Sequence, residues 1–144
     1  MNNQDTIELL KECDAGCKMA ISSIDDVIEN VCNPTFKQKL VTNKEGHKQI
    51  EKEIQKLLSE NHNEGKDPNI IAKSMSWIET NMKLLLNDSD QTIADIMTDG
   101  CNMGIKSLHK YKNQYKTASK DAKDMTNQLI NIEQQLVEDM RMYL

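Results

Sequence analysis

The sequence predicts an all-α fold: a single four-helix bundle domain over residues 1–144, built from two similar helical hairpins joined by a crossover helix. Three observations support this prediction. Apolar residues recur at steps of three and four along most of the chain, which is the spacing of one face of a helix. With five glycines, two prolines and one phenylalanine, the chain is poor in turn formers and aromatic strand formers. The third observation is a motif that occurs twice.

The repeated motif reads Gly-Cys-x-Met-small-Ile-x-Ser-aliphatic and occupies residues 16–24 and 100–108. A weaker repeat matches the pair Ile50 and Glu51 to the pair Ile132 and Glu133. Because each hairpin then contains one copy of both patterns, we expect the two hairpins to be internal repeats of one unit. Two hairpins joined by a connection that runs the length of the molecule form a four-helix bundle with a crossover.

The first hairpin is predicted for residues 5–61. Asp5 followed by Glu8 predicts a capping box at the start of its first helix. That helix should stop at Asn33-Pro34, where Asn33 can cap the second helix and Pro34 can occupy its first turn. The turn signals therefore divide this segment into two long antiparallel helices.

The second hairpin is predicted for residues 89–143, after a crossover helix at residues 68–86. The crossover helix begins with Asp67-Pro68, which repeats the signal of a capping residue followed by proline. A break at residues 117–119 separates the two helices of the second hairpin. The chain thus contains two hairpins with one extra helix between them.

Small residues occupy the middle of the two helices that carry the repeated motif. A glycine inside a helix costs about 1 kcal/mol relative to alanine, so small residues four apart suggest that another helix passes close by. We therefore predict that these two helices cross closely at Gly16, Cys17, Ala20, Gly100, Cys101 and Gly104. Leucine at position 104 should then overpack the crossing. The alternative is that the small residues are tolerated without a special contact.

Charge and cysteine content argue against several classes of protein. The net charge of −5 disfavours a nucleic-acid partner, because phosphate binding requires a basic surface. Apolar runs fall short of the ~18 residues of a membrane span, and the first residues lack the pattern of a signal peptide. The four cysteines contain no Cys-x-x-Cys pair, so we expect reduced thiols and a cytoplasmic location. The sequence is compatible with a homodimer and identifies no protein partner.

The repeated Met-[Gly/Ala]-Ile pattern and the stretch Asn81-Met82-Lys83-x-Leu85 carry a family resemblance. In these features the chain resembles the ferritin-like superfamily, and more closely the small bacterial ferritin-like bundle proteins of Firmicutes. The resemblance covers nearly the whole chain and implies a ferritin-like four-helix bundle. In metal-binding members, two helices each supply Glu-x-x-His and two more each supply one Glu, all directed into the bundle.

The chain departs from this ligand pattern. Glu51 and Glu133 match two of the glutamates, but Ile54 and Leu136 stand where the histidines would be. On the other two helices the matching positions lie near the motif cysteines instead of glutamates. A di-iron site needs about four carboxylates and two imidazoles. We therefore expect the di-metal site to be largely missing and no cofactor to be bound.

Two other groups of side chains are candidates for metal chemistry. His47 lies on the apolar face of its helix, where it is either a hydrogen-bonded core histidine or a metal ligand. Cys17 and Cys101 with Met19 and Met103 are soft ligands of the kind that suits Cu(I). Each methionine lies two residues from its cysteine, about 200° around the helix, and should face elsewhere. Packing of the cysteines in the core is the competing interpretation.

The sequence contains no recognisable nucleophile–base pair, phosphate-binding loop or carboxylate dyad, so no catalytic residue is predicted. It favours a non-enzymatic ferritin-like bundle with a structural or interaction-mediating function. The alternative is a divergent metal-binding or redox member of the superfamily that uses Glu51, Glu133 and, as a further candidate, His47. Thiol accessibility bears on this choice, since core packing predicts that Cys32 is more accessible than the motif cysteines.

Overall fold

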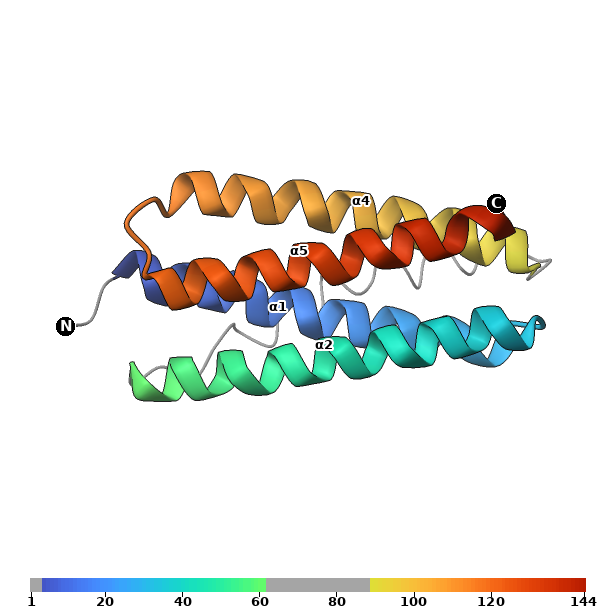
Figure 1. Cartoon of the computed structure of the whole chain (residues 1–144), viewed down its shortest axis with the longest axis horizontal. Helices are drawn as coiled ribbons and strands as arrows, with labels where there is room; N and C mark the ends of the chain where they lie inside the picture. The colour runs from blue at the N-terminus through green and yellow to red at the C-terminus, as the bar shows by residue number, and fades with distance from the viewer. Residues whose placement is uncertain (1–3, 62–88) are drawn as a thin grey trace.

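The computed structural model describes residues 4–61 and 89–144, and all regular structure within them is helical (Figure 1). The helices are α1 (Gln4–Val27), α2 (Pro34–Glu60), α4 (Asp90–Gln114) and α5 (Lys120–Met140), with short 3-10 helices at Ile28–Asn30 and Arg141–Tyr143. No strand occurs in the two described ranges, so the all-α prediction is confirmed. The crossover helix predicted for residues 68–86 lies outside the described residues.

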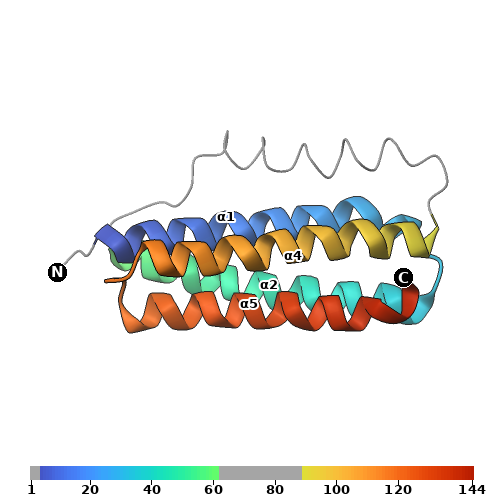
Figure 2. The same cartoon turned by 90° about the horizontal axis from the view of Figure 1, so that it is seen from above.

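The helices pack as a four-helix bundle of two layers. α1 runs antiparallel to α2, and α4 runs antiparallel to α5 (Figure 1). The two pairs meet where α1 contacts α4 and α2 contacts α5, and α1 also contacts α5 across the bundle. Seen from above, α1 and α4 form one layer and α2 and α5 form the other (Figure 2). α2 ends at one end of the bundle and α4 begins at the opposite end (Figure 1).

The start of α2 follows the sequence signals. The Oδ1 atom of Asn33 accepts hydrogen bonds from the backbone N of Thr35 and of Phe36 at 2.8 and 3.1 Å. Pro34 is the first residue of α2, so the predicted cap and proline are confirmed. The predicted end of the first helix is wrong, because α1 ends at Val27 and a 3-10 turn leads towards Asn33. None of the described helices is long and apolar enough to cross a bilayer.

Two aspartates fasten the hairpins to each other, one at each end of the bundle. The carboxylate of Asp5 accepts hydrogen bonds from the backbone N and the Oγ1 atom of Thr117 at 3.0 and 2.7 Å. The carboxylate of Asp90, the first residue of α4, accepts hydrogen bonds from the backbone N of Cys32 and of Asn33 at 2.8 and 2.9 Å. Each aspartate therefore holds the interhelical turn of the other hairpin, and we call these contacts the aspartate clasps.

The first clasp replaces the capping box predicted at Asp5. Asp5 lies inside α1, which is described from Gln4 onwards, and its carboxylate bonds to the turn between α4 and α5. The hydrogen bonds from Thr117 hold the pKa of Asp5 below its usual value. The prediction is wrong because a distant turn competes successfully for a carboxylate that local spacing assigns to the helix end.

The apolar core forms two clusters along the bundle axis. One contains Leu9, Leu10, Cys13, Cys17, Ile54, Leu108 and Leu129 among its members. The other contains Ile24, Val27, Phe36, Leu40, Met97, Cys101, Leu136 and Met140 among its members. On each of the four helices several residues separate the two clusters. Between the two clusters, along the bundle axis, lie the buried polar side chains of His47 and Glu133.

A buried aspartate joins the two helices of the first hairpin. The side chain of Asp14 on α1 is fully buried. Its carboxylate accepts hydrogen bonds from Nζ of Lys18 at 2.7 Å and from Nε2 of Gln55 on α2 at 2.6 Å. These partners satisfy the charge, which would otherwise be costly to bury. Asp14 therefore has a structural role in pairing α1 with α2.

Candidate functional site

A cavity of about 430 Å³ lies between α1 and α4, and α2 and α5 contribute to its wall. Its apolar lining includes Ala15, Ile24, Met97, Leu108 and Leu136. Its polar and ionisable lining includes Glu12, His47, Ser107, Tyr111 and Glu133. On α1 the lining runs from Glu12 to Ile24, so the cavity extends about 18 Å along the bundle axis.

The small residues of the repeated motif line this cavity. Gly16 and Ala20 of α1 and Gly100 and Gly104 of α4 all contribute to its wall. A Cβ atom at Gly16 would meet Leu129 of α5 at 3.6 Å, and the nearest atoms at Gly104 also belong to α5. Among the described residues, the small side chains of α1 and α4 thus border the cavity, and the atoms nearest to the Cβ positions of Gly16 and Gly104 belong to α5. The close crossing of α1 and α4 at these residues stays a prediction.

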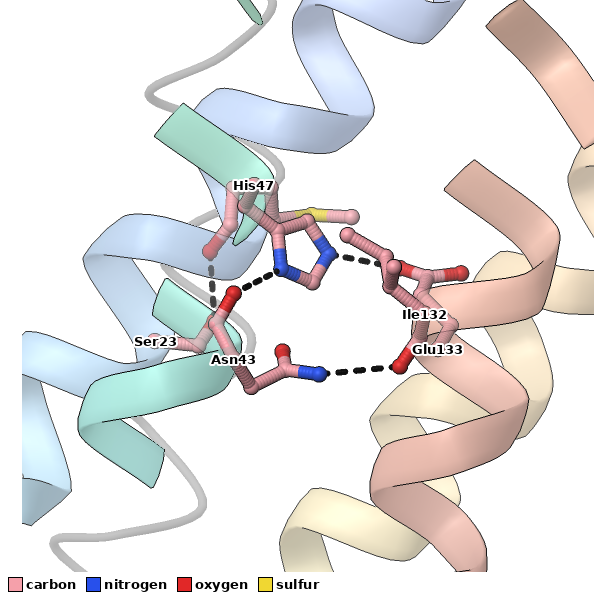
Figure 3. A network of polar contacts seen from close by, with 6 residues as sticks. Ser23, Asn43, His47, Ile132 and Glu133 are labelled. Atoms are coloured by element: carbon pink, nitrogen blue, oxygen red, sulfur yellow. Dashed lines mark hydrogen bonds and ion pairs between the residues drawn. The ribbon is translucent and has the colours of Figure 1, made fainter. Parts of the chain in front are cut away.

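Glu133, His47 and Asn43 form a polar layer between the two apolar clusters (Figure 3), which we call the polar level. Glu133 and His47 also line the cavity. The Nδ2 atom of Asn43 donates a hydrogen bond to the carbonyl oxygen of Ile132 at 2.8 Å, which joins α2 to α5. The Nδ1 atom of His47 lies 3.0 Å from the carbonyl oxygen of Asn43, and its Nε2 atom lies 3.9 Å from Oε1 of Glu133. The two polar positions on the apolar face of α2 thus both face α5 at residues 132–133.

Glu133 is an unusual group to bury. Its side chain is 6% exposed, and burial raises its pKa, an effect that the nearby His47 partly opposes. Its Oε2 atom has no hydrogen-bond partner among the described residues, and neither has Nε2 of His47. Most buried polar atoms in proteins are partnered. The pair therefore leaves two polar atoms available at the cavity wall.

Gly104 makes room for the carboxylate of Glu133. A Cβ atom built at Gly104 would lie 2.8 Å from Oε2 and 3.1 Å from Oε1 of Glu133. Real Cβ atoms do not approach so closely, so any larger residue at position 104 would displace the carboxylate. Gly104, one of the predicted helix-crossing residues, thus leaves the space that the buried carboxylate of Glu133 occupies.

The structure does not assemble the alternative metal set. His47 and Glu133 come together, but Glu51 is a half-buried residue of α2 that does not line the cavity. Burial and the neighbouring Asp14 raise the pKa of Glu51. Within residues 4–61 and 89–144, no three side chains of His, Cys, Asp or Glu are placed to hold a metal ion.

The soft-ligand set is brought together only in part. Met19, Cys101 and Met103 contribute to the lining of the same cavity. Met103 is 55% exposed, which places it at the rim. Cys17 is fully buried in the core and is not a lining residue of the cavity.

The thiols should differ strongly in reactivity. Cys32 is exposed, whereas Cys13, Cys17 and Cys101 are buried. Burial raises the pKa of Cys13 to about 12, and it also raises the pKa values of Cys17 and Cys101. Because the thiolate is the reactive form, we expect a thiol reagent to modify Cys32 first in the native protein and all four cysteines alike in denaturant. Peptide mass spectrometry over a labelling time course measures this order, and rapid native labelling of Cys17 or Cys101 would favour a redox function.

Glu12 and Tyr111 are cavity residues that the sequence reasoning missed. Burial raises the pKa of Tyr111 to about 12, with the neighbouring Glu12 contributing in the same direction. A signal was present, because Glu12 lies four residues before Gly16 and Tyr111 lies seven after Gly104, on the helix faces that carry the small residues. Neither residue was predicted to belong to a site.

No protein-family model, curated protein or solved structure matches the chain. Helical bundles support many unrelated functions, so the fold alone does not assign one. The function has to be argued from the cavity and its polar level.

Proposed function

We propose that the protein is a non-enzymatic binding module, in which a ferritin-like helical bundle holds a small, mostly apolar ligand in the cavity between α1 and α4. The observation that carries this proposal is the coincidence of a cavity with two buried polar atoms, Oε2 of Glu133 and Nε2 of His47, that lack partners in the described residues. An unpartnered buried polar group costs about 1–3 kcal/mol. Two of them in one wall weaken the bundle, and binding a ligand gives a reason to keep them.

The size and lining of the cavity support a small molecule. Its volume of about 430 Å³ falls within the ~300–1,000 Å³ of typical ligand pockets. The wall is mainly apolar, with a few polar groups gathered around Glu133 and near Glu12. Such a wall stabilises an apolar ligand by removing its surface from water, while the polar groups fix its orientation.

The ferritin-like assignment, with two repeated hairpins joined by a crossover, is part of this proposal. The antiparallel packing of α1 with α4 and of α2 with α5 supports it, as does the separation of the end of α2 from the start of α4 (Figure 1). The aspartate clasps add support for an internal repeat, because Asp5 and Asp90 make corresponding contacts from corresponding helices. We place the module in the cytoplasm of a bacterium, without a nucleic-acid partner, and leave a homodimer open.

A neutral probe tests whether the cavity binds ligands. We expect 1-octanol to bind the full chain and to raise its free energy of unfolding, by about 2.7 kcal/mol at one hundred times the dissociation constant. Calorimetric titration and thermal unfolding measure the two effects. In the variant Ser107→Phe a large side chain enters the cavity wall, and binding should be lost.

The matched control is Asn102→Phe, which places the same side chain at an exposed position of α4 outside the cavity. This variant should bind octanol as the parent does. Failure of the parent to bind octanol and its charged analogues would refute the proposed function. Equal binding by the parent and Ser107→Phe would also refute it, because the probe would then occupy another part of the molecule.

A further inference from the structure

We propose that the ligand is a primary amine with an apolar body, bound as an ammonium ion by the carboxylate of Glu133. This inference rests on the proposed function and names the chemical class of the ligand in the same cavity. It follows from the positions of the hydrogen-bond acceptors at Glu133 and His47, from the charges that line the cavity, and from the space that Gly104 leaves.

His47 and Glu133 present hydrogen-bond acceptors to the cavity. The Nδ1 atom of His47 lies 3.0 Å from the carbonyl oxygen of Asn43, and since that oxygen only accepts, Nδ1 carries a hydrogen. In a neutral imidazole Nε2 is then an acceptor. It faces Oε1 of Glu133 at 3.9 Å, which is too long for a hydrogen bond.

The remaining acceptor is Oε2 of Glu133, which has no partner among the described residues. A ligand that satisfies this level must therefore donate more than one hydrogen bond from a single small group. A primary ammonium ion carries three N–H donors and no acceptor, so it can serve Oε2 of Glu133 and Nε2 of His47 together. A hydroxyl group offers one donor, and a carboxylate ligand offers none.

The charges around the cavity favour a cation. Its described lining residues include two carboxylates, Glu12 of α1 and Glu133 of α5, and neither lysine nor arginine. The other titratable groups that face Glu133 or the cavity are His47 of α2, Cys13 and Cys17 of α1, and Cys101 and Tyr111 of α4. Burial raises the pKa values of these thiols and of the tyrosine, so they stay uncharged near neutral pH. A buried carboxylate gains most from a partner of opposite charge.

The lining of the cavity also indicates towards which end the apolar part of the ligand extends. One end of the cavity is lined by Ile24, Met97 and Leu136, and the opposite end carries Glu12 and Tyr111. Glu133 lies between these ends. An alkyl chain that leaves the ammonium group is therefore buried best towards Ile24 and Met97, where most of the lining side chains are apolar.

Gly104 fixes the place of the binding carboxylate. A Cβ atom at this position would meet both carboxylate oxygens of Glu133, whereas a Cβ atom at Gly46 would make only an ordinary contact with Ile132 at 3.8 Å. The carboxylate ends a flexible side chain, so Gly104→Ala should move it rather than unfold the helix. The variant Gly46→Ala is the matched control, because it adds the same methyl group in a helix without touching Glu133.

Three probes of equal chain length test the inference: n-octylammonium, 1-octanol and octanoate, each titrated into the full chain by calorimetry. We expect octylammonium to bind about tenfold more tightly than octanol, the scale of one hydrogen bond to a charged group. Octanoate should bind more weakly than octanol. If octanol binds and octylammonium binds no better, the amine inference fails while the proposed function stands. If no probe binds, the proposed function fails and the inference fails with it.

Two variants locate the preference for the amine. Glu133→Gln keeps the shape of the side chain and removes its charge, so it should lose the preference for octylammonium and keep its affinity for octanol. Gly104→Ala should also reduce the preference. Glu138→Gln, the same change at an exposed position of α5, and Gly46→Ala should leave it intact. A preference that persists in Glu133→Gln would overturn the assignment of this carboxylate.

Discussion

Phe36→Ala is expected to lower the free energy of unfolding by about 3–5 kcal/mol, the range for removing a large aromatic side chain from a core. Phe36 is fully buried, belongs to the apolar cluster near the turn between α1 and α2, and stacks on Tyr143 with ring centroids 4.4 Å apart. The change leaves a cavity between α2 and the C-terminal segment. Chemical denaturation of the parent and the variant measures the difference.

Met142→Ala is the control for this region, because Met142 neighbours Tyr143 in sequence but is 77% exposed. Its substitution should change the stability by less than about 0.5 kcal/mol. A loss below about 1 kcal/mol for Phe36→Ala would mean that the second apolar cluster is packed differently from the structure described above.

The double variant His47→Leu with Glu133→Met should be more stable than the parent, by up to about 4 kcal/mol, and should lose the preference for octylammonium. Replacing a buried carboxylate and the imidazole beside it by apolar residues of similar volume can be neutral or stabilising, because the cost of removing these polar groups from water disappears. Here Oε2 of Glu133 and Nε2 of His47 are unpartnered, which adds to that cost. Denaturation and calorimetric titration on the same samples measure both effects.

The opposite result would change the interpretation of the polar level. If the free energy of unfolding of the double variant is lower by more than about 2 kcal/mol, His47 and Glu133 together stabilise the bundle. The stability argument for a ligand would then be lost. Glu138→Met, at an exposed position of α5, controls for the removal of one negative charge and should change the stability by less than about 0.5 kcal/mol.

The sequence predicts much of the fold because helix signals are local. Asn33 and Pro34 mark the start of α2, and the spacing of apolar residues identifies most of the buried positions of all four described helices. Burial of Cys17 and Cys101 is also confirmed. Each of these features depends on residues that are neighbours in the chain or that share one helical face.

The site depends on how faces of different helices meet, which periodicity does not determine. Gly104 and Glu133 were each singled out, but their contact follows from the rotation of α4 against α5. The burial of Asp14 was not predicted, because a charged residue beside an apolar stripe is usually exposed to solvent. Its burial becomes intelligible only when Gln55 of α2 lies next to it. The small residues likewise indicate a space, and the sequence does not say whether a helix or a cavity occupies it.

The aspartate clasps make the lengths of the two hairpins interdependent. Asp5 and Asp90 reach turns at opposite ends of the bundle, so each hairpin is held against the other at both of its ends. Inserting one helical turn would lengthen a hairpin by about 5.4 Å and carry one aspartate out of reach of its turn. Insertions and deletions should therefore be accepted only in matched pairs during evolution, and homologous chains should vary in the two hairpins together. The same constraint keeps the small residues of α1 opposite those of α4 however the surface diverges.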